Sequence, residues 1–107
     1  MLPIIQQVAN EYKAELQKLY GDELAELILF GSYARGDYWE ESDVDFAVVL
    51  DKEEISPFEE ITKTSGASSK LSLKYGILVS SFHTTLYKKQ TSIQGVYQEI
   101  RKEGILI

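Results

Sequence analysis

Apolar residues recur at two different spacings along the chain, and these spacings predict where helices and strands form. Near the N-terminus they return every three or four positions, which is the spacing of one face of an α-helix. Pro3 suits the first turn of this helix, and Gly21 is expected to end it. The apolar face consists of Ile5, Val8, Tyr12, Leu16 and Leu19.

Three short apolar runs predict buried β-strands. Leu24–Phe30 is stopped by Gly31 and is too short to be a helix of its own. Val44–Leu50 is rich in β-branched and other apolar residues, and Ile77–Val79 is the third predicted strand.

The remaining segments predict two helices separated by a long loop. Pro57–Leu73 is expected to be helical, although its centre is rich in Ser, Thr and Gly. Ser80–Gln90 is polar and is expected to form the loop, and Gly104 is expected to cap the last helix. The apolar face of that helix is formed by Ile93, Val96, Tyr97 and Ile100. Helices alternating with strands predict an α/β (α+β) fold with a small mixed β-sheet flanked by helices.

Length and composition restrict the class of protein. The 107 residues suit one domain, spanning residues 1–107. Asp and Glu number 17 against 11 Lys and Arg, so the net charge of −6 argues against direct nucleic-acid binding. Without Cys there is no disulfide, thiolate nucleophile or Cys-ligated zinc site. Apolar runs are far shorter than the roughly 20 residues of a membrane span, and the N-terminus lacks a signal-peptide pattern, so a cytoplasmic protein is expected.

Two short motifs carry the candidate chemistry. Gly31 and Ser32 directly follow a predicted strand, where backbone N–H groups and a hydroxyl can approach a phosphate; the alternative is a turn in which Ser32 caps a helix. Asp43 and Asp45 stand two apart at the head of the next strand, so both carboxylates point to one face. Mg²⁺ is commonly held by such carboxylates together with substrate phosphates; the alternative is an acidic, solvent-exposed strand end.

The spacing of these motifs resembles a known signature. Ten residues separate Gly31-Ser32 from Asp43-x-Asp45, and the segment GSYARGDYWEESDVDFAVVL is similar to that of the DNA polymerase β-like nucleotidyltransferases. The short chain resembles the minimal nucleotidyltransferases, which are antitoxin partners of HEPN toxins. The resemblance implies a palm-like nucleotidyltransferase fold and transfer of AMP from Mg·ATP to a tyrosine hydroxyl of a HEPN ribonuclease toxin.

The same resemblance implies roles for individual residues. Gly31 and Ser32 would hold the phosphates of ATP, and Asp43 and Asp45 would be the catalytic ligands of Mg²⁺. Related families usually carry a third carboxylate on a later strand, but Tyr75–Ser81 contains no acid. Ser80 is the best candidate for that position, and a serine cannot act as a general base at neutral pH. Glu99, or an acid of the partner, is left as a possible substitute.

Three further kinds of residue have two interpretations each. Arg35 could bind a phosphate, or be a surface arginine beside the acidic loop. His83, the one histidine, could act as a base, although a histidine in a polar loop is usually just solvated. Tyr33 and Tyr38 flank the motif and could stack on a base, but a partner interface is favoured.

Three functions are therefore compatible with the sequence. An adenylyltransferase that modifies a HEPN-type toxin is favoured. An antitoxin that binds its toxin without catalysis is the alternative, because the third carboxylate is missing. A small-molecule nucleotidyltransferase of the aminoglycoside-modifying kind ranks last, because 107 residues leave no room for a substrate domain.

Overall fold

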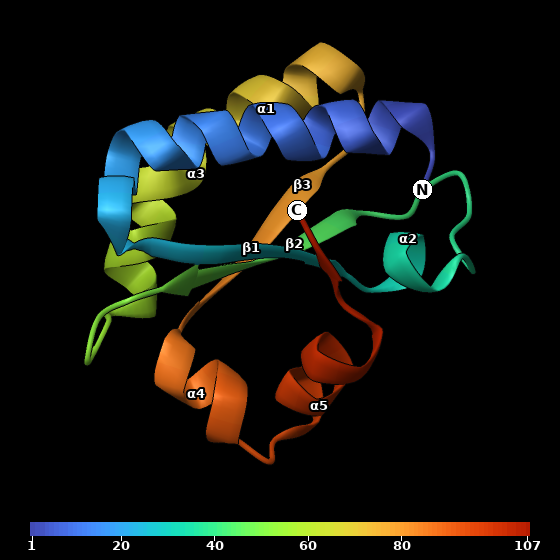
Figure 1. The fold of residues 1–107 in the computed structure, drawn as a ribbon. Coiled ribbons are helices and arrows are strands. Elements are labelled where there is room, and N and C mark those ends of the chain that lie inside the picture. Colours follow the sequence, from blue (N-terminus) through green and yellow to red (C-terminus); the bar gives the residue numbers. More distant parts are fainter.

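A four-stranded β-sheet with helices on both faces forms the framework of the molecule (Figure 1). The computed structural model describes residues 1–107. The strands lie in the order β3-β2-β1-β4, with β2 parallel to β3 and β1 antiparallel to both β2 and β4. Their bounds are Leu24–Phe30 for β1, Val44–Leu50 for β2, Val79–Thr85 for β3 and Ile105–Leu106 for β4. The predicted mixed sheet is confirmed.

Two long helices cover one face of this sheet and two short ones cover the other (Figure 1). The long pair is α1 (Pro3–Tyr20) and α3 (Pro57–Tyr75), and the short pair is α4 (Leu86–Thr91) and α5 (Gly95–Glu103). A 3₁₀ turn, η1 (Gly21–Glu23), follows α1, and the four-residue α2 (Ser32–Arg35) follows β1. None of these helices is long and apolar enough to cross a membrane.

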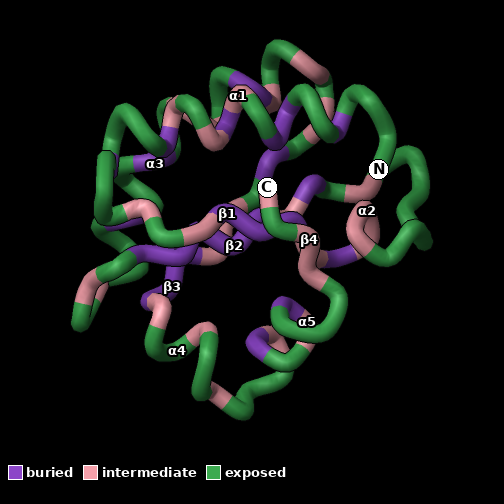
Figure 2. The backbone as a smooth tube through the Cα atoms, viewed as in Figure 1, coloured by how far each residue is buried: buried purple, intermediate pink, exposed green.

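The alternation of side chains along β2 divides the core into two clusters. Val44, Phe46, Val48 and Leu50 face α1 and α3, whereas Ala47 and Val49 pack against Ile28 and Ile100 on the other face. Figure 2 shows the buried residues concentrated on the strands. Asp45 has the parity of Ala47 and Val49, so its carboxylate lies on the α5 face of the sheet.

The prediction for residues 77–90 is wrong in its boundaries. The third strand begins at Val79 and continues to Thr85, and α4 follows directly, so there is no long polar loop. Contacts with distant elements satisfy two of the polar side chains of β3. Ser81 bonds to the Tyr12 hydroxyl at 2.6 Å, and Thr84 bonds to the Tyr97 hydroxyl at 2.8 Å. A local sequence pattern does not reveal such partners.

His83 is also placed differently from the expectation of a solvated loop residue. It lies in β3, is 6% exposed, and its Nε2 is 3.0 Å from the Thr64 hydroxyl. Burial lowers the pKa of its imidazole. Its Nδ1 has no partner within the chain.

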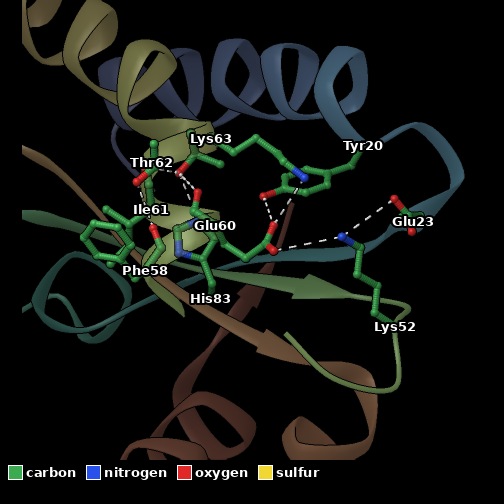
Figure 3. Close-up of polar contacts among 10 residues, drawn as sticks. Tyr20, Glu23, Lys52, Phe58, Glu60, Ile61, Thr62, Lys63 and His83 are labelled. Atoms are coloured by element: carbon green, nitrogen blue, oxygen red, sulfur yellow. Dashed lines mark hydrogen bonds and ion pairs between the residues drawn. The ribbon is translucent and has the colours of Figure 1, made fainter. Parts of the chain in front are cut away.

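A polar cluster joins α1, α3 and the loop after β2 at the far end of β2 from Asp45 (Figure 3). Glu60 is buried, and its carboxylate accepts a 2.7 Å hydrogen bond from the Tyr20 hydroxyl. Lys63 and Lys52 lie 3.8 Å and 4.0 Å from the same carboxylate. Burial, together with Glu60, raises the pKa of Tyr20 well above its usual range. The cluster therefore fixes the long helices to the sheet, away from the candidate site.

Candidate functional site

The end of β1 and the beginning of β2 lie side by side and bring the two motifs together. Phe30 is the register partner of Asp45 in the antiparallel pair, so Gly31 follows immediately beside this carboxylate. Gly31 has φ of 78°, and a Cβ built on it would lie 2.5 Å from Asp45 Oδ2. A side chain at position 31 would collide with the carboxylate, and only glycine adopts this φ without strain. The pairing of β1 with β2 therefore brings both motifs to one end of the sheet.

Gly31 is the N-cap of α2, and Ser32 is the first residue of that helix. The alternative in which Ser32 caps the helix is therefore wrong, since no side chain caps α2. The carbonyl of Gly31 accepts from the amides of Ala34 and Arg35, at 3.1 Å and 3.0 Å. The first amides of any helix lack partners inside it, so the N–H groups of Ser32 and Tyr33 remain available here.

The two aspartates differ in exposure. Asp43 precedes β2 and is exposed, whereas Asp45 is partly buried as the second residue of the strand. Burial raises the pKa of the Asp45 carboxyl, the charges of Asp43 and Glu99 raise it further, and Arg35 opposes them. The charges of Asp43, Asp45 and Glu99 therefore repel one another, and a cation would neutralise this negative charge.

No acidic residue occurs in β3, and Ser80 occupies the position beside Asp45. The two residues are register partners in the parallel pair, and Ser80 is exposed. Ser80 therefore lies where the sequence analysis placed the missing third carboxylate. Glu99, on α5, is the other acid whose charge reaches Asp45.

Arg35 connects α2 to α5 through ion pairs. Its Nη1 lies 2.6 Å from Glu99 Oε1 and 3.4 Å from Glu103 Oε2, while its Nε lies 3.1 Å from Asp37 Oδ2. The guanidinium is engaged by three carboxylates. Sequence reasoning missed this arrangement because Glu99 and Glu103 lie more than 60 positions away along the chain.

Tyr33 and Tyr38 stack on each other, with ring centroids 4.7 Å apart. They line a hollow of about 310 Å³ between α2 and the first turn of α1, whose other lining residues include Leu2, Ile5 and Ile105. Tyr33 packs with the core on the α1 side of the sheet. These rings therefore lie on the face opposite to Asp45.

The donor set at this site fits a magnesium ion that is held jointly with a nucleotide. No group of three or more His, Asp and Glu side chains is arranged to hold a metal ion by itself. The chain supplies two neighbouring carboxylates, Asp43 and Asp45, whose charges interact. One or two carboxylates are the usual protein contribution where substrate phosphates complete the coordination of Mg²⁺. Asp43 and Asp45 are thus suited to a metal that arrives with its nucleotide.

Comparison with known proteins identifies the family. Residues 9–107 match the family described as nucleotidyltransferase domain, and the match includes the whole site. This chain belongs to the nucleotidyltransferase domain family.

Two archaeal relatives match this nucleotidyltransferase over nearly its whole length. Both come from Methanocaldococcus jannaschii, and both are provisionally named protein adenylyltransferases. One is 42% identical over 99 residues, covering 92% of this chain and 94% of the relative. The other is 32% identical over 95 residues, covering 87% of this chain and 93% of the relative.

Solved structures share the fold. A provisionally named nucleotidyltransferase from Sulfolobus solfataricus superposes with a TM-score of 0.68 at 23% identity, covering 95% of this chain and 78% of that one. A chain of a toxin–antitoxin structure with AMP-PNP superposes with a TM-score of 0.60 at 19% identity, covering 89% of this chain and 68% of that one. These likenesses confirm the nucleotidyltransferase fold expected from the sequence.

Proposed function

We propose that this nucleotidyltransferase transfers AMP from Mg·ATP to a tyrosine hydroxyl of a partner toxin of the HEPN type. The close approach of the Gly31 backbone to Asp45 Oδ2 carries the proposal, because it puts a phosphate-binding turn directly beside an acidic pair. The names of the archaeal relatives support a protein acceptor. The toxin–antitoxin neighbour supports a toxin as that acceptor.

Different residues of the chain bind the phosphates and the metal ion during the transfer. The Ser32 hydroxyl and the free amides of Ser32 and Tyr33 bind phosphate oxygens. Asp43 and Asp45 would hold Mg²⁺, which would supply positive charge to neutralise the phosphates. The acceptor oxygen bonds to the α-phosphorus, the bond from that phosphorus to the bridging oxygen breaks, and pyrophosphate leaves.

The proton of the acceptor hydroxyl needs a destination outside β3. Ser80 stands beside Asp45 but cannot take a proton at neutral pH. A basic group of the partner or a water molecule receives it in this proposal. General-base catalysis typically contributes about 10²–10⁴-fold, so transfer to an acceptor without such a group is expected to be slow.

Intact mass spectrometry of the partner tests the proposal. The toxin-like protein encoded beside this chain is incubated with the chain, Mg²⁺ and ATP, and its mass is measured. Addition of AMP that disappears with Asp43→Asn/Asp45→Asn is expected. Unchanged addition with the double variant would contradict the assigned roles of both aspartates.

The absence of an acid from β3 favours one second candidate, an antitoxin that neutralises its toxin by binding alone. In that case the partner keeps its mass, still co-purifies with the chain, and is neutralised equally well by the double variant. ATP then makes no difference to neutralisation.

A further inference from the structure

The sheet order determines the side from which an acceptor reaches the site. Gly31 directly follows β1, the two aspartates lie at the start of β2, with Asp43 just before it and Asp45 within it, and β3 lies beyond them at the edge of the sheet. In phosphoryl-type transfer the attacking and leaving oxygens lie roughly in line on opposite sides of the phosphorus. If Gly31 and Ser32 hold the leaving phosphates, the hydroxyl enters from the β3 side.

The edge on that side is open where it passes the site. The Val44 amide donates to the Leu78 carbonyl at 2.9 Å, so the even-numbered residues of β3 direct their peptide groups at β2. The peptide groups of Val79 and Ser81 therefore point away from β2, towards the outer edge of the sheet. Ser72 Oγ accepts from the Val79 amide at 2.9 Å, but no strand lies beside Ser81 on the outer side of β3.

This edge lacks the features that normally prevent pairing with another chain. β3 is seven residues long and contains neither a proline nor a Lys, Arg, Asp or Glu. Its C-terminal half is buried, so the accessible part is the stretch from Ser80 to Phe82, next to Asp45. The accessible edge and the candidate site therefore lie together.

A groove with an apolar lip runs along the same edge. It has a volume of about 350 Å³ and lies between the last turns of α3 and the start of β3. Leu73 is 87% exposed and Leu78 is 59% exposed, although both are large apolar residues. The other lining residues are Ser68, Ser69, Ser72 and Val79.

We propose that the accessible edge of β3 from Ser80 to Phe82 and the adjoining groove receive an extended segment of the protein acceptor as an added strand. Side chains alternate between the two faces of a strand, so an apolar residue enters the groove while its neighbour lies on the Asp45 face. The added strand lies two strand spacings, roughly 10 Å, from β2, which favours a long hydroxyl side chain such as tyrosine.

Charge complementarity specifies the residues beside that hydroxyl. The loop leading to β2 carries Asp37, Glu40, Glu41 and Asp43, all exposed, and Asp43 directly precedes the residue that bonds to Leu78. The net charge of the chain is −6. Arginine or lysine flanking the acceptor hydroxyl is therefore the complementary chemistry.

A synthetic peptide tests this docking without nucleotide. The peptide alternates leucines with polar residues, namely a central tyrosine and one arginine on either side of it. Its binding is followed by fluorescence anisotropy. Leu73→Ser/Leu78→Ser is expected to weaken binding about tenfold or more by removing apolar contact area. Ile93→Ser, at an apolar residue that is 83% exposed elsewhere, is the matched control and is expected to leave binding unchanged.

Two modified peptides separate strand addition from other binding. N-methylation of the backbone amides that face β3 is expected to abolish binding, and glutamates in place of the arginines are expected to weaken it. Failure of the parent peptide to bind, an equal effect of Ile93→Ser, or full binding of the N-methylated peptide would overturn the inference.

The inference rests on the proposed function, and a separate measurement distinguishes the two. The melting temperature of the native chain with and without Mg·ATP reports on the nucleotide site alone. A nucleotide-dependent shift without peptide binding overturns the docking surface and leaves the transferase proposal intact. Peptide binding with the expected variant effects but no shift supports the docking surface and counts against the transferase proposal.

Discussion

At the scale of single residues, backbone conformation and close packing together explain why glycine occupies position 31. Its φ of 78° is strained for residues with a side chain, and Asp45 Oδ2 occupies the space that a Cβ at position 31 would need. The sequence indicated Gly31, Ser32, Asp43 and Asp45 because strand alternation and a glycine after a strand are local signals. It did not reveal the ion pairs of Arg35, because their partners are distant along the chain.

Gly31→Ala is expected to abolish Mg·ATP binding and to destabilise the fold by more than the about 1–2 kcal/mol of backbone strain. The added Cβ would displace the Asp45 carboxylate. Gly36→Ala is the matched control, since Gly36 has φ of 90° and open space around its Cβ position. Urea unfolding and nucleotide titration of both variants check this, and equal losses in the two would contradict it.

Asp45→Asn is expected to raise the melting temperature of the metal-free protein at pH 7. The folded state raises the pKa of Asp45, chiefly through burial, so ionisation destabilises the fold as the pH rises above the ordinary value of 3.8. The penalty is complete above the raised pKa and absent below the ordinary one. Melting curves recorded with a chelator should therefore show a higher melting temperature for the variant at pH 7, and this difference should shrink as the pH is lowered towards 4. A lower melting temperature of the variant at pH 7 would contradict this.

At the scale of elements, the long helices and the apolar strands were predictable, whereas β3 was not. Val44–Leu50 can be interpreted from its own composition because its residues are apolar on both faces. In β3 the polar residues are stabilised by partners on other elements, such as Tyr12 for Ser81 and Tyr97 for Thr84. These contacts exist only after the chain has folded, so the local pattern resembled a loop.

The ion pairs between α2 and α5 allow a test in which two variants should change the affinity for Mg·ATP in opposite directions. Phosphates of ATP and the carboxylates of Glu99 and Glu103 compete for the Arg35 guanidinium if Arg35 binds nucleotide. Arg35→Ala is then expected to weaken Mg·ATP binding, and Glu99→Gln/Glu103→Gln to strengthen it. Because these ion pairs are partly exposed, each variant should change the free energy of unfolding little. Unchanged nucleotide affinity in both would remove Arg35 from the site.

At the scale of the whole molecule, the residues that stabilise the fold and those of the candidate site lie at separate positions. The core between the sheet and the helices α1 and α3 stabilises one face of β2 (Figure 1). The buried Glu60 cluster stabilises the end of β2 that is far from Asp45 (Figure 3). The motifs gather at the opposite end of β2, between the end of β1 and the open edge of β3. Family membership and fold followed from the sequence, whereas the open edge required the strand order.

We propose that Gly31, Ser32, Asp43 and Asp45 form one site for a magnesium nucleotide. Isothermal titration calorimetry with a non-hydrolysable ATP analogue tests it most directly, because binding is measured apart from turnover. We expect the native chain to bind the analogue only when Mg²⁺ is present, and Asp43→Asn/Asp45→Asn to weaken binding at least tenfold while the chain remains folded. Binding that is independent of Mg²⁺, or equal affinity in the double variant, would contradict the account.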